Sequence, residues 1–159
     1  MKKKQLDNAY SNIFIDEKEV FALSLPITII YRQLFSQNEN VLQTKYSLIH
    51  SEIDVLATLL FNGKVMTPTD LYEATIFSSG GMTKILKKLE NKELISRVSS
   101  PKDKRSKLVQ IELKGEELVK ECFIDIIENN NKIFSVLSKK ERDSLKGILK
   151  KLVYSLVKN

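Results

Sequence analysis

The 159-residue chain has a composition typical of a globular protein, with 42% hydrophobic and 29% charged residues. Cys122 is its only cysteine and His50 its only histidine, which excludes an internal disulfide framework and leaves too few ligands for a Cys/His zinc site. The sequence has no apolar run of about 18 residues, and a polar stretch follows its basic start. We therefore expect one compact domain, with or without an extension, in the cytoplasm, with no metal, no cofactor and no membrane partner.

The net charge of +6 is confined to one stretch of the chain. Residues 78–110 contain nine basic and three acidic side chains, whereas the basic and acidic residues outside this stretch balance. A localised positive field is typical of a protein with a polyanionic partner. A solvated basic face is the alternative that charge alone leaves open.

The first half of the chain is predicted to be helical. Apolar residues predict a long helix over 17–40, which Pro26 kinks or starts, after a short helical arm over 6–14. Apolar side chains on most faces of the long helix indicate burial on several sides. A further helix over 51–61 ends at Asn62-Gly63, a helix stop signal.

Two helices separated by a glycine-bearing turn are predicted next. The first is short, with Thr67 as its cap, Pro68 in its first position and its end near Thr75. The turn Ser78-Ser79-Gly80-Gly81 offers a hydroxyl cap for the second. The apolar residues of the second helix fall on one face: Met82, Ile85, Leu86 and Leu89.

One short hairpin and two long helices complete the chain. The strands are predicted at 94–98 and 107–111, with a polar basic loop between them. Two long helical patterns follow Gly115, and the second begins with a capping box formed by Ser138 and Glu141.

A short helix, a tight turn, an amphipathic helix and a hairpin with a basic tip form the pattern of a winged helix-turn-helix. The second helix is suited to the major groove of duplex DNA, its start and its lysines to phosphate, and the hairpin loop to the neighbouring minor groove. The residues expected to bind DNA are Thr67, Thr69, Ser78, Ser79, Gly80, Met82, Thr83, Lys84, Lys87, Lys88, Arg97, Lys102, Asp103, Lys104 and Arg105.

An ordered set of short motifs runs through residues 51–115. It comprises Ser51-Glu52-Ile53-Asp54-Val55-Leu56, Thr67-Pro68-Thr69-Asp70-Leu71, Ser78-Ser79-Gly80-Gly81-Met82-Thr83, Leu89-Glu90, Leu94-Ile95-Ser96-Arg97, Asp103-Lys104-Arg105-Ser106, and Ile111 before Lys114-Gly115. With this set the segment resembles the winged-helix core of the MarR family of bacterial transcriptional regulators. The Asp-x-Arg that follows a Leu-Ile-x-Arg strand is the most specific element.

The resemblance implies a mostly α fold with a small β-hairpin wing, in which a winged helix over 49–115 is flanked by dimerisation helices in 1–48 and 116–159. It implies a homodimer, most often a repressor and not an enzyme, that binds pseudo-palindromic DNA. Arg105 would enter the minor groove, oriented by Asp103. Many members release DNA when a small anionic aromatic ligand binds between the two parts.

The sequence departs from the family pattern at three helix ends. Glu93 stands where a glycine usually ends the recognition helix, and we expect that end to be built differently because a left-handed conformation disfavours a side chain. Glu112 and Ile49 stand where a threonine usually caps a helix.

Several residues have both a functional and a structural interpretation. The candidate ligand-pocket residues are Tyr31, Arg32, Tyr46 and His50, although His50 also suits a helix start with a solvated ring. Cys122 is either a redox switch or, as its apolar neighbours favour, a packed thiol. The apolar stripe over 145–156 favours a dimer interface over a membrane-surface helix.

Three other functions compete with DNA binding. A winged helix whose basic face meets an acidic protein partner is the main alternative, and it would show little affinity for duplex DNA. A hydrolase is disfavoured because His50 lies outside any recognised nucleophile motif. RNA binding is disfavoured because aromatic residues are sparse near the basic stretch.

Overall fold

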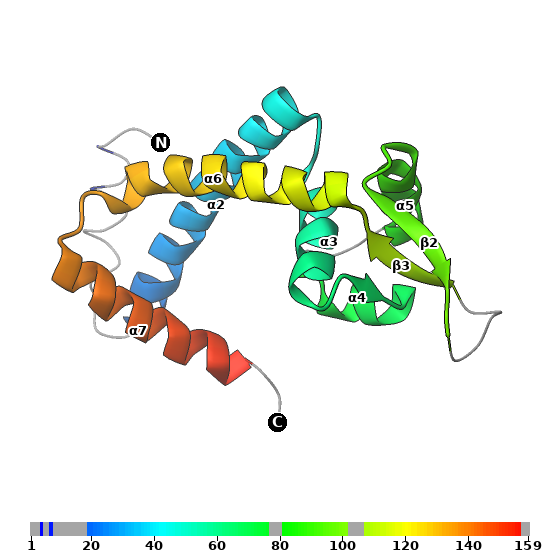
Figure 1. The fold of residues 1–159 in the computed structure, drawn as a ribbon. Coiled ribbons are helices and arrows are strands. Elements are labelled where there is room, and N and C mark those ends of the chain that lie inside the picture. The colour runs from blue at the N-terminus through cyan, green and yellow to red at the C-terminus, as the bar shows by residue number, and fades with distance from the viewer. Residues whose placement is uncertain (1–3, 5–6, 8–18, 77–80, 102–106, 157–159) are drawn as a thin grey trace. The chain divides into compact units, whose positions relative to one another are not determined.

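The computed structural model describes residues 4, 7, 19–76, 81–101 and 107–156 (Figure 1). The chain divides into two compact units, residues 1–40 and 41–159, which are taken separately below. The elements are α2 (Glu19–Tyr46), α3 (His50–Phe61), β1 (Val65–Met66), α4 (Pro68–Ala74), α5 (Met82–Asn91), β2 (Ile95–Ser99), β3 (Lys107–Ile111), α6 (Leu113–Phe134) and α7 (Lys139–Leu156).

The unit over 1–40 contains the first part of α2. Pro26 lies inside this helix, which continues to Tyr46 and so runs six residues beyond the predicted end. The expected burial on several sides is wrong for the isolated chain, since Val20 is 78% and Leu23 64% exposed. The predicted arm over 6–14 falls almost entirely outside the described residues.

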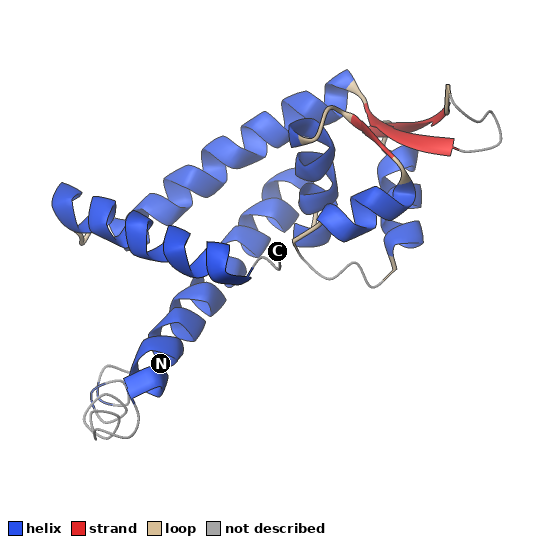
Figure 2. Ribbon diagram, turned by 90° about the horizontal axis from the view of Figure 1, so that it is seen from below, coloured by secondary structure: helices blue, strands red, loops and turns tan. Residues whose placement is uncertain are grey.

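The unit over 41–159 is built around α3. This helix packs against α4, α5, α6 and β3, and Figure 2 shows the strands beside the short helices. Leu56 and Leu59 of α3 are fully buried, as are Leu71 of α4, Leu89 of α5 and Val119 of α6. The winged region therefore has a closed core of its own, because each neighbouring element turns an apolar face towards α3.

Three strands form one antiparallel sheet in the order β1-β3-β2. The predicted hairpin is present, with Arg97 opposite Val109, although β2 starts at Ile95. The expectation of only two strands is wrong, because Val65 and Met66 pair with Gln110 and Val109. Two residues are too few to show the alternation that identifies a strand.

The end of α5 corrects a further expectation. Glu93 adopts the left-handed conformation with φ 60°, so the helix ends in the usual way despite the missing glycine. The N–H of Leu94 donates to the carbonyl of Leu89 at 3.0 Å and the N–H of Glu93 to that of Glu90 at 2.9 Å. Leu94 and Leu89 are both buried, so apolar packing around this Schellman motif offsets the backbone strain.

The helix starts show which capping predictions hold. The hydroxyl of Thr67 accepts from the N–H of Asp70 at 3.0 Å, as predicted. Ser138 and Glu141 form the predicted capping box, with the N–H of Ser138 donating to Glu141 at 2.7 Å. The predicted hydroxyl cap of α5 is wrong, because the N-cap is Gly81, which has no side chain.

Two N-caps lack a side-chain hydrogen bond, because neither Ile49 nor Glu112 caps its helix with a side chain.

Helix α6 starts earlier than predicted. Gly115 lies inside α6 rather than before it. A Cβ at this glycine would lie 2.4 Å from the carbonyl oxygen of Leu94, so only glycine permits this approach of α6 to the chain before β2.

The apolar residues of α7 remain on the surface. No side chain of this helix is buried, and Ile148, Leu152 and Val153 are each about half exposed, at 58%, 49% and 58%. None of the helices within the described ranges combines the length and apolar character needed to cross a bilayer.

Candidate nucleic-acid interface

Helix α5 separates its apolar and polar residues on opposite faces. Ile85, Leu86 and Leu89 are buried against the domain, as predicted, and Met82 is half-buried. The exposed side carries Thr83, Lys84, Lys87 and Lys88. The helix is thus held by apolar contacts while a hydroxyl and several ammonium groups face outward.

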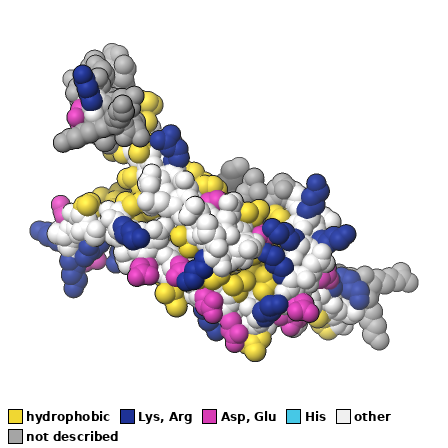
Figure 3. Space-filling view, turned by 90° about the horizontal axis from the view of Figure 1, so that it is seen from above, with side chains coloured by type: hydrophobic (Ala, Val, Ile, Leu, Met, Phe, Trp, Pro, Cys, Tyr) yellow, Lys and Arg dark blue, Asp and Glu magenta, His cyan; other side chains and the backbone are white. Residues whose placement is uncertain are grey.

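The surface charge is not uniform over the molecule. Figure 3 shows Lys and Arg side chains interspersed with Asp and Glu on one face. A continuous positive field does not cover that face, so contacts to a polyanion must come from particular elements. Two described elements expose several basic side chains: α5 carries Lys84, Lys87 and Lys88, and α7 carries Lys139, Lys140, Arg142, Lys146, Lys150 and Lys151.

Helix α5 begins after a glycine. Gly81 precedes the helix with φ 93°, and nothing lies within 4 Å of where a Cβ would stand. The N–H groups at a helix start suit an anion such as phosphate. Ser78, Ser79 and Gly80, which were predicted to contact DNA, lie outside the described residues.

Lys88 differs from its neighbours because it has a partner. Its Nζ lies 2.7 Å from Oε1 of Glu52, a carboxylate on α3 that is 1% exposed. The prediction that Lys88 contacts phosphate stays a prediction, and part of its ammonium group already faces Glu52. Lys84 and Lys87 are therefore the stronger candidates for phosphate contacts.

The remaining predicted DNA contacts fall into three groups. The hydroxyl of Thr67 caps α4, and Thr69 is exposed in the first turn of that helix. Arg97 is half-buried on β2. The wing residues Lys102, Asp103, Lys104 and Arg105 lie outside the described residues.

A charged cluster joins the last turn of α2 to α6. Lys45 Nζ and the Tyr46 hydroxyl both donate to Oδ2 of Asp125, at 2.6 and 2.5 Å. These two hydrogen bonds, with that of Lys45 first, hold the pKa of Asp125 below its ordinary value. The pKa of Lys45 is raised by the same carboxylate, and that of Tyr46 is raised by burial and then by Asp125.

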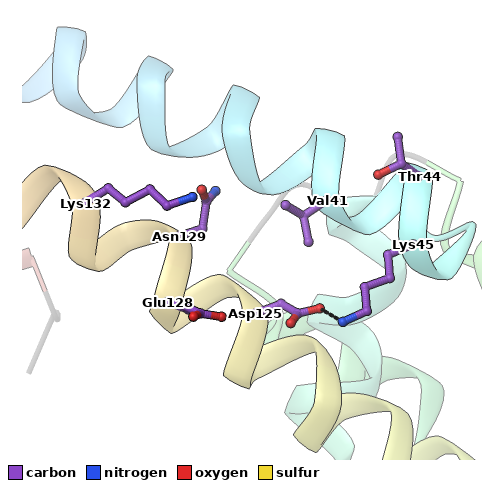
Figure 4. Close-up of a pocket in the computed structure, with 7 residues that line it drawn as sticks. All are labelled: Val41, Thr44, Lys45, Asp125, Glu128, Asn129 and Lys132. Carbon is purple, nitrogen blue, oxygen red and sulfur yellow. Dashed lines mark hydrogen bonds and ion pairs between the residues drawn. The ribbon is translucent and has the colours of Figure 1, made fainter.

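A cavity of about 400 Å³ lies beside this cluster (Figure 4). The Lys45–Asp125 ion pair lies towards one end of the labelled residues, and Asn129 and Lys132 lie further along α6. Its lining residues are Val41, Thr44, Lys45, Asp125, Glu128, Asn129 and Lys132.

The four predicted pocket residues have separate environments. Tyr31 and Arg32 are exposed on the part of α2 that belongs to the unit over 1–40. The hydroxyl of Tyr46 is already bonded to Asp125. The alternative expectation of a solvated ring at His50 is wrong, because this residue is only 9% exposed at the start of α3.

Cys122 lies in the core, as its apolar neighbours indicated. It is fully buried on α6, and this burial raises the pKa of its thiol to about 12. A neutral thiol shielded from solvent is a poor nucleophile, so the environment is that of a packed side chain.

Two contacts of α5 were not predicted from the sequence. Lys92 Nζ donates to the carbonyl of Ser47 at 2.7 Å, and Glu52 pairs with Lys88. The sequence offered one signal for the role of Glu52, because a glutamate three residues after an N-cap often bonds back to the N–H of that cap. In the structure, Oε2 of Glu52 accepts from the N–H of Ile49 at 3.0 Å. The partners on α5 depend on tertiary contacts that no local pattern reports.

Comparisons with known proteins show which family this chain is similar to. A family model described as the MarR family matches residues 46–106. The HTH-type transcriptional regulator MhqR of Bacillus subtilis (strain 168) is 32% identical over 108 residues, which are 68% of this chain and 74% of the relative. The HTH-type transcriptional regulator PecS of Dickeya dadantii (strain 3937) is 29% identical over 118 residues, covering 73% and 71% of the two chains.

Solved structures of similar fold agree with the sequence relatives. A MarR family protein from Bacillus stearothermophilus superposes with a TM-score of 0.78 at 20% identity, covering 91% of this chain and 99% of the other. A mutant MarR from E. coli complexed with operator DNA gives a TM-score of 0.66 at 22% identity, covering 84% and 95%. The winged helix around α5, the sheet with its hairpin and the sequence relatives all lead to one conclusion: the chain belongs to the MarR family of transcriptional regulators.

Proposed function

We propose that the protein is a repressor that binds pseudo-palindromic duplex DNA as a homodimer and is released by a small ligand. The observation that carries this proposal is the division of α5 into a buried apolar face and an exposed face with Thr83, Lys84 and Lys87. The mutant MarR of E. coli, which has the same fold, was solved in complex with operator DNA.

In this proposal α5 is the recognition helix. The major groove is about 12 Å wide and admits one helix, whose N-terminal residues then face the base edges. Thr83 and the backbone after Gly81 stand at that end, while Lys84 and Lys87 are placed to contact phosphates. Sequence preference would come from the first turn, and the lysines would add affinity without reading the sequence.

The wing supplies a second contact. Arg97 lies in the middle of β2 and Lys107 begins β3, so each strand of the hairpin carries a basic residue. We assign Arg105 to the minor groove, with Asp103 orienting its guanidinium group. An arginine in that groove responds to its width and to A·T content.

The homodimer is supported by apolar faces that the isolated chain leaves in water. On α7, Ile148, Leu149, Leu152, Val153 and Leu156 are all at least 41% exposed. Val20, Phe21, Leu23 and Ile27 of α2 are at least 51% exposed. Exposed apolar surface of this extent marks an interaction site, and a second copy would place two recognition helices on a two-fold axis. The regions 1–48 and 116–159 then serve dimerisation, and 49–115 serves DNA binding.

A small anionic aromatic ligand is the release signal in this proposal. Its support is the cavity beside Tyr46, whose lining includes the ammonium groups of Lys45 and Lys132 together with the carboxylates of Asp125 and Glu128. A cavity of about 400 Å³ falls within the range of small-molecule sites. A ligand carboxylate that bonded to Lys45 would compete with Asp125 for the same ammonium group.

Selection from a pool of duplexes with a randomised centre tests the DNA-binding proposal. The full-length protein should enrich an inverted repeat with half-sites about 10 base pairs apart, because each copy of α5 would read one half-site. Enrichment without symmetry would contradict the homodimer on DNA. No retention of any duplex at low salt would contradict DNA binding and favour the alternative of an acidic protein partner for the same basic face.

A further inference from the structure

The recognition helix is attached to the rest of the domain by two lysines as well as by its apolar face. Lys88 and Lys92 are four residues apart and therefore lie one turn apart on the same side of the helix. Both reach the segment over 47–52, which we call the α2–α3 joint. Lys88 Nζ lies 2.7 Å from Glu52 Oε1, and Lys92 Nζ donates to the Ser47 carbonyl at 2.7 Å.

Glu52 is the buried end of this attachment. Its side chain is 1% exposed, whereas that of Lys88 is 50% exposed. Oε2 accepts from the N–H of Ile49 at 3.0 Å, whereas Oε1 lies 2.7 Å from Lys88 Nζ as an ion pair without hydrogen-bond geometry. A buried carboxylate without a cation is strongly unfavourable, so Lys88 is expected to stay close to Glu52.

The two kinds of contact restrict α5 in different ways. Burial of Ile85, Leu86 and Leu89 holds the helix against α3 and decides which face of α5 is exposed. The Lys88–Glu52 ion pair and the Lys92–Ser47 hydrogen bond add two points of attachment on one side of the helix. They therefore restrict the small rotations of α5 that apolar packing leaves open, and with them the positions of Thr83, Lys84 and Lys87.

We propose that Glu52 is a positioning residue for DNA recognition, acting through Lys88 to restrict the small rotations of α5 that its apolar packing leaves open. This inference rests on the proposed function, in which the exposed face of α5 reads DNA. Glu52 itself does not reach the exposed face, because its carboxylate is buried. Its substitution would change which bases are read without removing any group that contacts DNA.

The competing role of Lys88 is a direct phosphate contact, and the two roles predict opposite effects of Glu52→Gln. Glutamine keeps the size of the side chain and an oxygen for the N–H of Ile49, but removes the charge that holds Lys88. If Lys88 contacts phosphate, its release from Glu52 should raise the affinity for every duplex and steepen the salt dependence. If Glu52 positions α5, affinity for the preferred duplex should fall with an unchanged salt slope.

The experiment is a double-mutant cycle in the full-length protein. The variants are Glu52→Gln, Lys88→Met and the two combined, with Lys88→Arg as the conservative variant that keeps the ion pair. Lys87→Met serves as the reference for loss of a phosphate contact, since Lys87 is exposed on the same helix. Fluorescence anisotropy is measured on a duplex selected by the wild-type protein from the randomised pool and on a scrambled duplex, across a salt series.

The proposal expects Glu52→Gln and Lys88→Met each to weaken binding to the selected duplex about tenfold, with the double variant no worse than either single one. For these variants, binding to the scrambled duplex and the salt slope should stay at the wild-type values. Lys88→Arg should keep the selectivity of the wild-type protein. Lys87→Met should instead weaken both duplexes alike.

Contrary results are easily distinguished. Stronger binding of Glu52→Gln to both duplexes, or selectivity equal to the wild type, would overturn the positioning role and leave the proposed function intact. If Glu52→Gln does not fold by circular dichroism, the comparison of Lys88→Met with Lys88→Arg decides, and equal selectivity of the two would overturn the role. Failure of the wild-type protein to select any duplex would instead overturn the proposed function.

Discussion

Helices α5 and α7 are both amphipathic, yet the apolar face of α5 is buried and that of α7 is exposed. The stripe of α5 is covered by α3 and its neighbours, and its three central residues are at most 9% exposed. The stripe of α7 stays on the surface, and no side chain of that helix is buried. Each fully buried aliphatic side chain contributes about 1.5–3 kcal/mol, so α5 already has a stabilisation that α7 lacks.

The difference teaches that the chain contains one complete core and one incomplete core. The winged region closes its core with residues of a single chain, in a cluster that runs from Leu42 to Cys122. Within the described ranges, no side chain of α7 is buried in this way. We infer that the apolar face of α7 is completed by a second copy, so that stability resides in the winged region and assembly in the terminal helices.

The largest expected effect breaks the assembly. Leu152→Glu places a charge in the apolar stripe of α7 and should weaken self-association by about 2 kcal/mol or more, since central interface residues contribute at this level. Sedimentation velocity should then show a monomer with unchanged helicity. Lys146→Gln is the matched control, because this exposed residue of α7 should leave the dimer intact. A dimeric Leu152→Glu protein would contradict the role of α7.

The next effect concerns the complete core. Gly115→Ala brings a Cβ to 2.4 Å from the Leu94 carbonyl oxygen, so either α6 or the chain before β2 must shift. We expect a loss of about 1–3 kcal/mol in the free energy of unfolding, measured by urea denaturation. Gly147→Ala on α7 meets nothing within 4 Å and should not destabilise the protein. Equal stability of both variants would mean that α6 does not pack closely at Gly115.

A third variant separates DNA binding from assembly. Arg105→Ala should weaken binding to the selected duplex by about 1–3 kcal/mol while the dimer persists. Anisotropy gives the affinity and sedimentation velocity the mass. Unchanged affinity would contradict the proposed minor-groove contact of Arg105. A monomeric variant would contradict the claim that DNA binding and dimerisation depend on different regions of the chain.

A smaller, stabilising effect is expected at the end of α5. Glu93 has φ 60°, and glycine adopts this conformation without strain from a Cβ. Glu93→Gly should therefore raise the free energy of unfolding by about 0.5–1 kcal/mol. Glu93→Ala loses the same contact with Lys114 but keeps the Cβ, so thermal denaturation should show no comparable gain. If Glu93→Gly is less stable than the wild type, the interactions of the Glu93 side chain stabilise the protein by more than its left-handed conformation costs.

The smallest effect is an absence of reaction at Cys122. Burial raises the pKa of its thiol to about 12, so the thiol stays protonated across pH 6–9. An aromatic disulfide reagent should label it only when the protein unfolds, at a rate that rises with urea. Rapid labelling of the native protein at pH 7 would contradict a packed thiol and revive a redox role.

The sequence predicted those parts of the fold that local patterns determine. Ile85, Leu86 and Leu89 recur with the helical period, and Thr67 caps α4 as its position indicated. The strand at Val65–Met66 was missed because its identity comes from pairing with β3. The left-handed Glu93 was missed because a residue preference of about one kcal/mol yields to the packing around it.

The candidate interface was predicted less completely than the fold. The exposed residues of α5 follow directly from the buried ones, so Thr83, Lys84 and Lys87 could be assigned in advance. The ion pair of Lys88 with Glu52 joins residues 36 positions apart in the sequence, and only the packing of α5 on α3 reveals it. For the same reason the burial of His50 did not follow from its position at a helix start.

A titration of the full-length protein into a fluorescent duplex tests the central claim most directly. The duplex comes from the region upstream of the protein's own gene, and random competitor DNA is present across a salt series. The account predicts binding that survives the competitor and saturates at two chains per duplex. Equal, salt-sensitive affinity for every duplex, or saturation at one chain per site, would contradict a sequence-reading dimer.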